Sequence, residues 1–330
     1  MPMEPKTERN LAMELARVTE AAALAAGRFM GRNDKNGSDA AAVNAMRVML
    51  NQIEMDGVVV IGEGEKDDAP MLYNGERIGT GAAPQVDIAV DPIDGTRLLA
   101  LGRANALATV GLADRGSMYN PGPFVYMDKL AVGPTARGAI DINASPADNL
   151  RSVARAKGCD VQDLTVVCLD RPRHDQLVAA VRAMGARIRL VTDGDVAGAL
   201  MTAWPESGID ILMGVGGSPE AVLAACALTC MGGEIQGKLY PRNADEIERG
   251  RAAGYDTSRI LHTADLVRSD NCFFAVTGIT DGELLQGVKY FGQGARTHSL
   301  VMRSKSGTVR EITATHRLDK LMKFSDIKYD

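Results

Sequence analysis

The sequence lacks the features that mark an exported or membrane-bound protein. It has no stretch of about 18 apolar residues, and its opening segment, MPMEPKTERN, has no basic region leading into an apolar one. The five cysteines form an odd set without a CxxC pair or a neighbouring histidine, unlike a disulfide framework or a zinc site. We therefore expect no export signal and no membrane span, and a location in the reducing cytoplasm.

Basic charge is not in excess either. The 37 lysines and arginines are outnumbered by 42 aspartates and glutamates, which gives a formal charge of −5. A nucleic acid held through its phosphates is therefore not an expected partner. An anionic small-molecule substrate would need bound cations to reverse the local potential.

The remaining composition is that of an ordinary globular protein, with 45% apolar and 24% charged residues. A length of 330 residues predicts one large α/β domain or two intimately packed halves. Apolar residues at helical spacing predict helices over 11–30 and 40–53, the second capped by Ser38 or Asp39. Short β-branched runs predict strands over 58–61 and 86–90.

Strand and helix patterns alternate more regularly in the second half. Helices are expected between the first four of its five predicted strands, which span 164–169, 188–192, 209–215, 273–277 and 299–303. The weakly patterned stretch 147–163 is the preferred boundary. We therefore expect two halves, residues 1–155 and 156–330.

Two of the predicted strands end in carboxylates. The first runs into Glu63, and the second into the string Asp91-Pro92-Ile93-Asp94-Gly95-Thr96. The proline and the glycine in that string favour a sharp turn that aims both aspartates at one point. Clustered carboxylates suit Mg²⁺ or Mn²⁺, and a helix beginning at Thr96 would offer free backbone N–H groups to an anion. Taken alone, the string could equally be a solvated turn with a helix cap.

Several other polar residues are ambiguous on pattern alone. Glu220 lies in the first turn of a predicted helix, where it could simply complement the helix dipole. Arg171 and Arg173 follow a predicted strand and could either fork onto a phosphate or lie on the surface. His174 is expected to cap or support its neighbours, and Tyr126 to be a strand residue.

These strings together resemble one protein family. The run from Asp91 to Thr96 is similar to the metal-site signature of the superfamily that contains inositol monophosphatases and fructose-1,6-bisphosphatases. The sequence more narrowly resembles the GlpX-type class II fructose-1,6-bisphosphatases from about residue 8 to residue 316. The strings that carry this likeness are 31–47, 61–65, 69–73, 171–175, 193–195 and 216–220.

The resemblance implies a fold and a reaction. The fold would be a layered α-β-α-β-α sugar-phosphatase sandwich, with a metal-binding first half and a sugar-phosphate-binding second half that contributes Glu220. The reaction would be metal-dependent hydrolysis of the 1-phosphate of fructose 1,6-bisphosphate, in gluconeogenesis or Calvin-type carbon metabolism. We expect Mg²⁺ or Mn²⁺ as the cofactor and a homo-oligomer, either a dimer or a tetramer.

The resemblance also implies roles for single residues. The expected metal ligands are Asp39, Glu63, Asp91, Asp94 and Glu220. The expected substrate contacts are Asp94, Gly95, Thr96, Tyr126, Arg171, Arg173, Asp193, Gly194, Asp195 and Gly217. Thr96 and Asp67, with help from Lys35, are expected to orient and deprotonate the attacking water, and the two arginines to hold the 6-phosphate. Many relatives carry Glu where this chain has Asp94, and residues 237–259 match the family poorly.

Three alternatives remain open on the sequence. Sedoheptulose 1,7-bisphosphate differs from the expected substrate mainly by one carbon, and an inositol-monophosphatase-like activity is possible within the superfamily. A non-catalytic sugar-phosphate sensor is disfavoured by the full set of carboxylates. A dinucleotide-binding enzyme is set aside, because Gly214-Val215-Gly216-Gly217 lacks the third glycine of GxGxxG.

Overall fold

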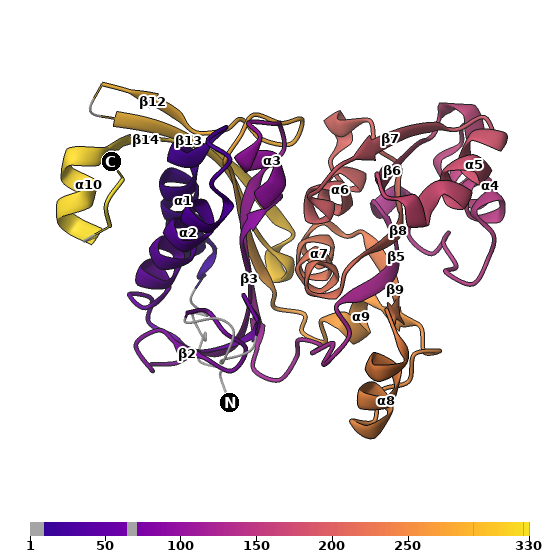
Figure 1. The fold of residues 1–330 in the computed structure, drawn as a ribbon, viewed down its shortest axis with the longest axis horizontal. Helices are drawn as coiled ribbons and strands as arrows, with labels where there is room; N and C mark the ends of the chain where they lie inside the picture. Colours follow the sequence, from indigo (N-terminus) through magenta and orange to yellow (C-terminus); the bar gives the residue numbers. More distant parts are fainter. Residues whose placement is uncertain (1–9, 65–70, 293, 326, 330) are drawn as a thin grey trace, which may run out of the picture.

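Two β-sheets alternate with three layers of helices in the computed structural model (Figure 1). The structure describes residues 10–64, 71–292, 294–325 and 327–329. The order of the layers is helices, sheet, helices, sheet, helices. The α-β-α-β-α sandwich implied by the resemblance is therefore confirmed.

The first sheet has eight strands in the order β12-β13-β11-β4-β3-β1-β2, with β14 paired to β13. Only β1 and β3 pair in parallel, and all its other pairs are antiparallel. Its strands are β1 (Asp56–Ile61), β2 (Arg77–Ile78), β3 (Gln85–Asp94), β4 (Leu107–Asp114), β11 (Phe273–Gly278), β12 (Lys289–Phe291), β13 (Gly294–Arg303) and β14 (Thr308–Arg317).

The second sheet has six strands in the order β10-β9-β5-β8-β6-β7. Strand β6 pairs in parallel with both β7 and β8, and the remaining pairs are antiparallel. The strands are β5 (Tyr126–Val132), β6 (Thr165–Leu169), β7 (Arg187–Val191), β8 (Ile211–Gly217), β9 (Glu234–Tyr240) and β10 (Leu261–His262).

Helices cover both outer faces and fill the space between the sheets. Helices α1 (Ala12–Ala26) and α2 (Lys35–Leu50) cover the first sheet, and α4 (Pro146–Lys157) and α5 (Asp175–Ala183) cover the second. The middle layer holds α6 (Asp195–Thr202) and α7 (Ser218–Met231). The shorter or peripheral helices are α3 (Thr96–Ala100), α8 (Ala244–Ala252), α9 (Thr263–Leu266) and α10 (Leu318–Ser325). None of the helices in the described ranges has the length and apolarity needed to cross a membrane.

Every strand predicted from the sequence is present, with shifted ends. The largest extension is at β13, which begins at Gly294 rather than at residue 299. The first predicted helix ends as α1 at Ala26 and continues as a short 3₁₀ turn, Gly27–Phe29. The sequence did not predict β2, β4, β9, β10, β12 and β14.

The predicted start of the second helix is wrong. Helix α2 begins at Lys35, five residues before the predicted start at residue 40, because the side chain of Asp34 accepts a hydrogen bond from the Gly37 N–H at 2.8 Å. That bond satisfies one of the N–H groups left free at a helix start. The cap is Asp34, and both Ser38 and Asp39 lie inside the helix.

The division into residues 1–155 and 156–330 stays a prediction. Strand β5 precedes the predicted boundary and belongs to the second sheet, whereas β11 to β14 follow it and complete the first. The chain thus leaves the first sheet after β4 and returns to it at β11.

The Asp34 cap gives a first testable prediction. Replacing Asp34 with alanine should lower the free energy of unfolding by about 1 kcal/mol, because the Gly37 N–H loses its acceptor. Asp34→Asn keeps a side-chain acceptor and should cost only a few tenths of a kcal/mol. Denaturant unfolding of both variants measures the difference, and equal stability of the two would contradict the cap.

Candidate active site

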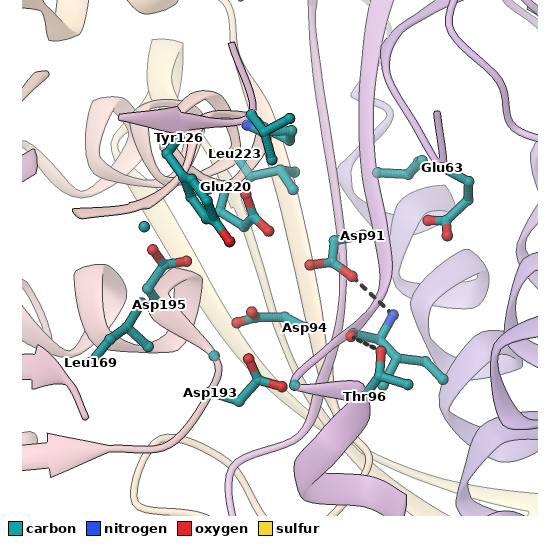
Figure 2. A pocket seen from close by; sticks show the side chains of 18 of the residues that line it. Glu63, Asp91, Asp94, Thr96, Tyr126, Leu169, Asp193, Asp195, Glu220 and Leu223 are labelled. Carbon is teal, nitrogen blue, oxygen red and sulfur yellow. Dashed lines mark hydrogen bonds between the residues drawn. The ribbon is translucent and has the colours of Figure 1, made fainter. Parts of the chain in front are cut away.

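A pocket of about 440 Å³ opens where the two sheets meet the middle helices. Its wall comes from the ends of β3, β6 and β8 and from the first turns of α3, α6 and α7. Figure 2 shows the carboxylates of Asp91, Asp94, Asp193, Asp195 and Glu220 around one space, with Glu63 beyond Asp91. The pocket therefore collects carboxylates from segments that are far apart in the sequence.

A β-bulge in β3 brings Asp91 and Asp94 to the same face of the first sheet. Asp91 lies opposite Thr109 of β4 and Asp94 opposite Leu107, so three steps along β3 match two steps along β4. In a regular strand, residues three apart point to opposite faces, and an extra residue reverses that. The bulge thus turns both carboxylates towards the middle layer, and it is what makes them neighbours in the pocket.

The turn after the bulge fixes Thr96 at the start of α3. Gly95 has a φ of 94°, which a glycine adopts without steric cost. The Thr96 hydroxyl donates to the Ile93 carbonyl at 3.2 Å, and the Ile93 N–H donates to Asp91 Oδ1 at 3.1 Å (Figure 2). Because its proton is engaged with Ile93, the Thr96 oxygen is left to accept a hydrogen bond from the pocket side.

Two glycines of β8 make room for the carboxylates of the middle layer. A Cβ atom on Gly216 would lie 1.8 Å from Asp195 Oδ2, and one on Gly217 would lie 1.7 Å from Glu220 Oε2. Such distances are impossible for real side chains, so Asp195 and Glu220 lie directly against the backbone of β8. Gly216 and Gly217 are therefore explained by close packing of carboxylates against the strand, whereas a Cβ atom on Gly214 would lie 2.9 Å from His174 Nε2.

Burial and mutual repulsion raise the proton affinity of the two aspartates from β3. Burial, and then the charges of Asp94, Glu220 and Glu63, raise the pKa of Asp91 well above its ordinary value. Burial, and then the charge of Asp195, do the same to the pKa of Asp94, which is 3% exposed. A hydrogen bond of 3.1 Å from the Ala197 N–H to Asp94 Oδ2 partly offsets this.

The glutamates belong to the same electrostatic network. Burial, and then the charges of Asp39 and Glu220, raise the pKa of Glu63 to about 8. Burial, and then the charge of Asp195, raise the pKa of Glu220 to about 7, against the opposing effect of Lys129. Burial also raises the pKa of Asp39. Carboxylates that repel one another in this way are stabilised when a bound cation neutralises their charge.

The donor set fits a hard divalent cation. Glu220 Oε2 is buried and has no hydrogen-bond partner among the described residues, so this oxygen is available to a cation. In that same part of the chain, no three acidic, histidine or cysteine side chains form a closed metal cage. An ion held here would complete its coordination with substrate oxygens and water, as Mg²⁺ usually does.

Two arginines line the same pocket as the carboxylates. Arg171 Nη2 lies 3.9 Å from Asp193 Oδ1, and the Arg97 N–H donates to the other oxygen of Asp193 at 3.3 Å. Arg173 donates from Nε and Nη2 to the Val215 carbonyl, at 3.2 and 2.7 Å. Both guanidinium groups line the pocket, so they form its basic side.

A third arginine lies beside the same rim. The guanidinium carbon of Arg173 is 4.9 Å from the centre of the Tyr126 ring, and that of Arg242 is 6.0 Å from it. Arg242 is held in place by the fully buried carboxylate of Glu246, at 2.5 Å. Sequence reasoning missed Arg242, and only its place between a strand and an N-cap asparagine could have pointed to an ordered position.

Comparison with known proteins agrees with this geometry. A sequence model described as "Bacterial fructose-1,6-bisphosphatase, glpX-encoded" matches residues 9–316. The chain belongs to this family. Fructose-1,6-bisphosphatase 1 class 2 of Escherichia coli strain K12 is 48% identical over 325 residues, which cover 94% of this chain and 96% of the relative. The class 2 fructose-1,6-bisphosphatases of Escherichia coli O6:H1 (strain CFT073) and Shigella flexneri match equally well.

Membership of the GlpX family confirms the resemblance, and the structure shows where the expected site residues lie. Thirteen of them line the pocket: Glu63, Asp91, Asp94, Gly95, Thr96, Tyr126, Arg171, Arg173, Asp193, Gly194, Asp195, Gly217 and Glu220. Asp39 is not among the lining residues, although its charge acts on Glu63. Lys35 is exposed at the start of α2, outside the lining set, and Asp67 falls outside the described residues.

His174 supports the basic side as a neutral group. The Val215 N–H donates to its Nε2 at 2.8 Å, so Nδ1 carries the proton and donates to the Leu169 carbonyl at 2.7 Å. Burial lowers the pKa of His174, which keeps it uncharged near neutral pH. The expected capping or supporting role of His174 thus agrees with a ring that links β6 to β8.

The raised glutamate pKa values predict how the metal-free protein responds to pH. Between the ordinary value of 4.5 and folded values of about 7 and 8, Glu220 and Glu63 hold protons that the unfolded chain has released. The free energy of unfolding that these bound protons contribute is therefore lost as pH rises through the folded pKa values of the two glutamates. From pH 6.5 to 8, above the ordinary histidine pKa, the EDTA-treated protein should lose about 1–2 kcal/mol.

Thermal unfolding at both pH values, with and without Mg²⁺ or Mn²⁺, measures this loss. The cation should restore stability more at pH 8 than at pH 6.5, because more of the carboxylates are then ionised. Glu63→Gln should flatten the pH dependence of the metal-free protein. A metal-free protein that gains stability over this interval would contradict the argument.

Proposed function

We propose that the protein hydrolyses the 1-phosphate of fructose 1,6-bisphosphate, giving fructose 6-phosphate and inorganic phosphate. The proposal is supported by family membership, because the relatives are named fructose-1,6-bisphosphatases. The single observation that carries it is a pocket of about 440 Å³ lined both by a carboxylate cluster and by Arg171 and Arg173. The carboxylates suit a phosphate that is bound together with cations, and the two arginines suit a second phosphate.

The metal ligands follow from the carboxylate set. Mg²⁺ or Mn²⁺ would be held by Asp39, Glu63, Asp91, Asp94 and Glu220, and would supply charge neutralisation and a lowered water pKa. Asp94 is the shorter counterpart of a residue that is Glu in many relatives. Its bond from the Ala197 N–H ties its position to α6.

The remaining residues would bind and orient the substrate. Thr96 would accept a hydrogen bond from the attacking water, since its own proton goes to Ile93. The water oxygen would form the new bond to phosphorus while the bond between phosphorus and the oxygen on C1 of the sugar breaks. Of the two protons of the water, one would end on that C1 oxygen and the other would stay on the released phosphate. Arg171 and Arg173 would hold the 6-phosphate, which fixes the scissile end near the carboxylates. Asp193 and Asp195 would accept hydrogen bonds from sugar hydroxyls.

We also propose a cellular compartment and an oligomeric state for the protein. All five cysteines are free thiols, which supports a reducing compartment such as the cytoplasm. Met30 and Leu101 are 53% and 46% exposed near the contact between Gly31 and Gly102, which supports a homo-oligomer, a dimer or a tetramer. Light scattering on the purified protein would measure its mass in solution.

Removal of the metal or of one ligand tests the reaction. EDTA should abolish phosphate release, and Asp91→Asn should lower kcat/KM by roughly 100-fold or more, because several kcal/mol of charge stabilisation is lost. The metal-free variant should be at least as stable as the wild type, since a buried like charge is gone. Asp245→Asn, in an exposed ion pair on α8, is the matched control and should keep full activity. Phosphate release that survives both EDTA and the Asp91→Asn substitution would contradict a metal-dependent reaction.

A substrate panel tests the specificity. Fructose 1,6-bisphosphate should exceed inositol 1-phosphate in kcat/KM by roughly 10-fold or more, because only the bisphosphate also engages the arginines. Arg171→Gln should lower kcat/KM for fructose 1,6-bisphosphate and leave that for inositol 1-phosphate unchanged, so the ratio between the two should fall. Sedoheptulose 1,7-bisphosphate, assayed beside them, shows whether the longer sugar fits the same two subsites. Faster turnover of inositol phosphate would favour the superfamily alternative.

A further inference from the structure

Lys129 is a buried cation on an otherwise apolar strand face. Along β5, Met127 and Ala131 share its face and belong to the core around α6 and α7. Lys129 lies between them and is 2% exposed. Burial of an ammonium group is costly unless it is paired and hydrogen-bonded, so its partners explain why it is there.

The Lys129 ammonium makes two contacts, both with residues of the pocket wall. Its Nζ lies 2.5 Å from Asp195 Oδ2 and donates to the Gly217 carbonyl at 2.9 Å. Asp195 is the first residue of α6, and Gly217 is the N-cap of α7. One buried group thus connects β5 to the starting points of both middle helices.

Close packing leaves this arrangement little freedom. A Cβ atom on Gly216 would lie 1.8 Å from Asp195 Oδ2 and 3.0 Å from Lys129 Nζ. The ion pair therefore occupies the space directly above a glycine of β8. Lys129 itself is not among the residues that line the pocket, so it lies behind the site rather than in it.

The ion pair lies within a strongly acidic environment. Asp195 is the largest charge influence on both Asp94 and Glu220, and Lys129 is the group that opposes it at Glu220. Arg171 and Arg173, by contrast, line the pocket itself. Loss of the ammonium would leave the Asp195 carboxylate facing other carboxylates, and it would then turn away from its present position.

We propose that Lys129 is a positioning residue that holds the Asp195 carboxylate towards the sugar and fixes the Gly217 turn from which Glu220 reaches the cation. The inference rests on the proposed function and deepens it, because Asp195 and Glu220 are a proposed substrate contact and a proposed metal ligand. Lys129 acts through both without touching either the substrate or the reacting atoms.

The test compares Lys129→Met with Lys129→Gln, which keeps a donor without the charge. Lys129→Met should raise KM for fructose 1,6-bisphosphate by roughly 10-fold, and Mn²⁺ binding measured by calorimetry should weaken. Lys129→Gln should fall between this variant and the wild type. Lys238→Met, which removes a lysine from the neighbouring strand β9, is the matched control and should change neither value.

A double-mutant cycle separates positioning from folding. Lys129→Met should also lower Tm, because Asp195 is left unpaired, and adding Asp195→Asn should recover much of that loss. In the Asp195→Asn background, Lys129→Met should raise KM by no more than roughly twofold, since the route through Asp195 is already lost. It should still weaken Mn²⁺ binding, because the contact with the Gly217 carbonyl is removed.

The outcomes that overturn the proposal are distinct from a failure of the proposed function. A folded Lys129→Met variant with wild-type KM and wild-type Mn²⁺ affinity would show a purely structural lysine. If neither Lys129→Met nor Lys129→Gln folds, equal Mn²⁺ affinity of Asp195→Asn and of the variant that combines it with Lys129→Met would overturn the role at Gly217. Absence of phosphate release from the wild type would instead sink the proposed reaction, and the Mn²⁺ comparison would still decide the role of Lys129.

Discussion

Asp91, Asp94 and Glu220 are buried together, and neighbouring negative charges oppose the ionisation of each: those of Asp94 and Glu220 at Asp91, and that of Asp195 at both Asp94 and Glu220. Repulsion of this kind would push the segments apart unless the backbone held them. The bulge in β3 fixes the two aspartates, and the glycines of β8 press Glu220 against the strand. The pocket is therefore prepared for positive charge before any ion or substrate arrives, which is preorganisation in the electrostatic sense.

The acidic side of the pocket was largely predictable because its signals are local. A β-branched run followed by Asp91-Pro92-Ile93-Asp94-Gly95 specifies a strand, a turn and two carboxylates within ten residues. The bulge was not predictable, since its register depends on pairing with β4, a strand that the sequence did not reveal. Glu220 was recognisable as a ligand only by resemblance, because its local pattern equally fits a residue that complements the helix dipole.

Features that depend on contacts between distant segments could not be predicted from the sequence, and the reason is physical. Lys129 interrupts the apolar face of β5 that Met127 and Ala131 form, and nothing local shows that its ammonium meets α6 and α7. Strand β14 has no buried residue, so the hydrophobic alternation that identifies a strand is absent. The early start of α2 depends on the hydrogen bond that the Asp34 side chain accepts from the Gly37 N–H. This bond outweighs the weak helix propensity of Asn36 and Gly37.

The return of the chain to the first sheet has a consequence for biosynthesis. Strand β11 lies between β4 and β13, yet it is separated from β4 by the whole of the second sheet. A ribosome must therefore release more than 150 residues after β4 before that strand finds its partner. Until then one edge of β4 stays without its partner strand, so the first sheet is completed only late in synthesis.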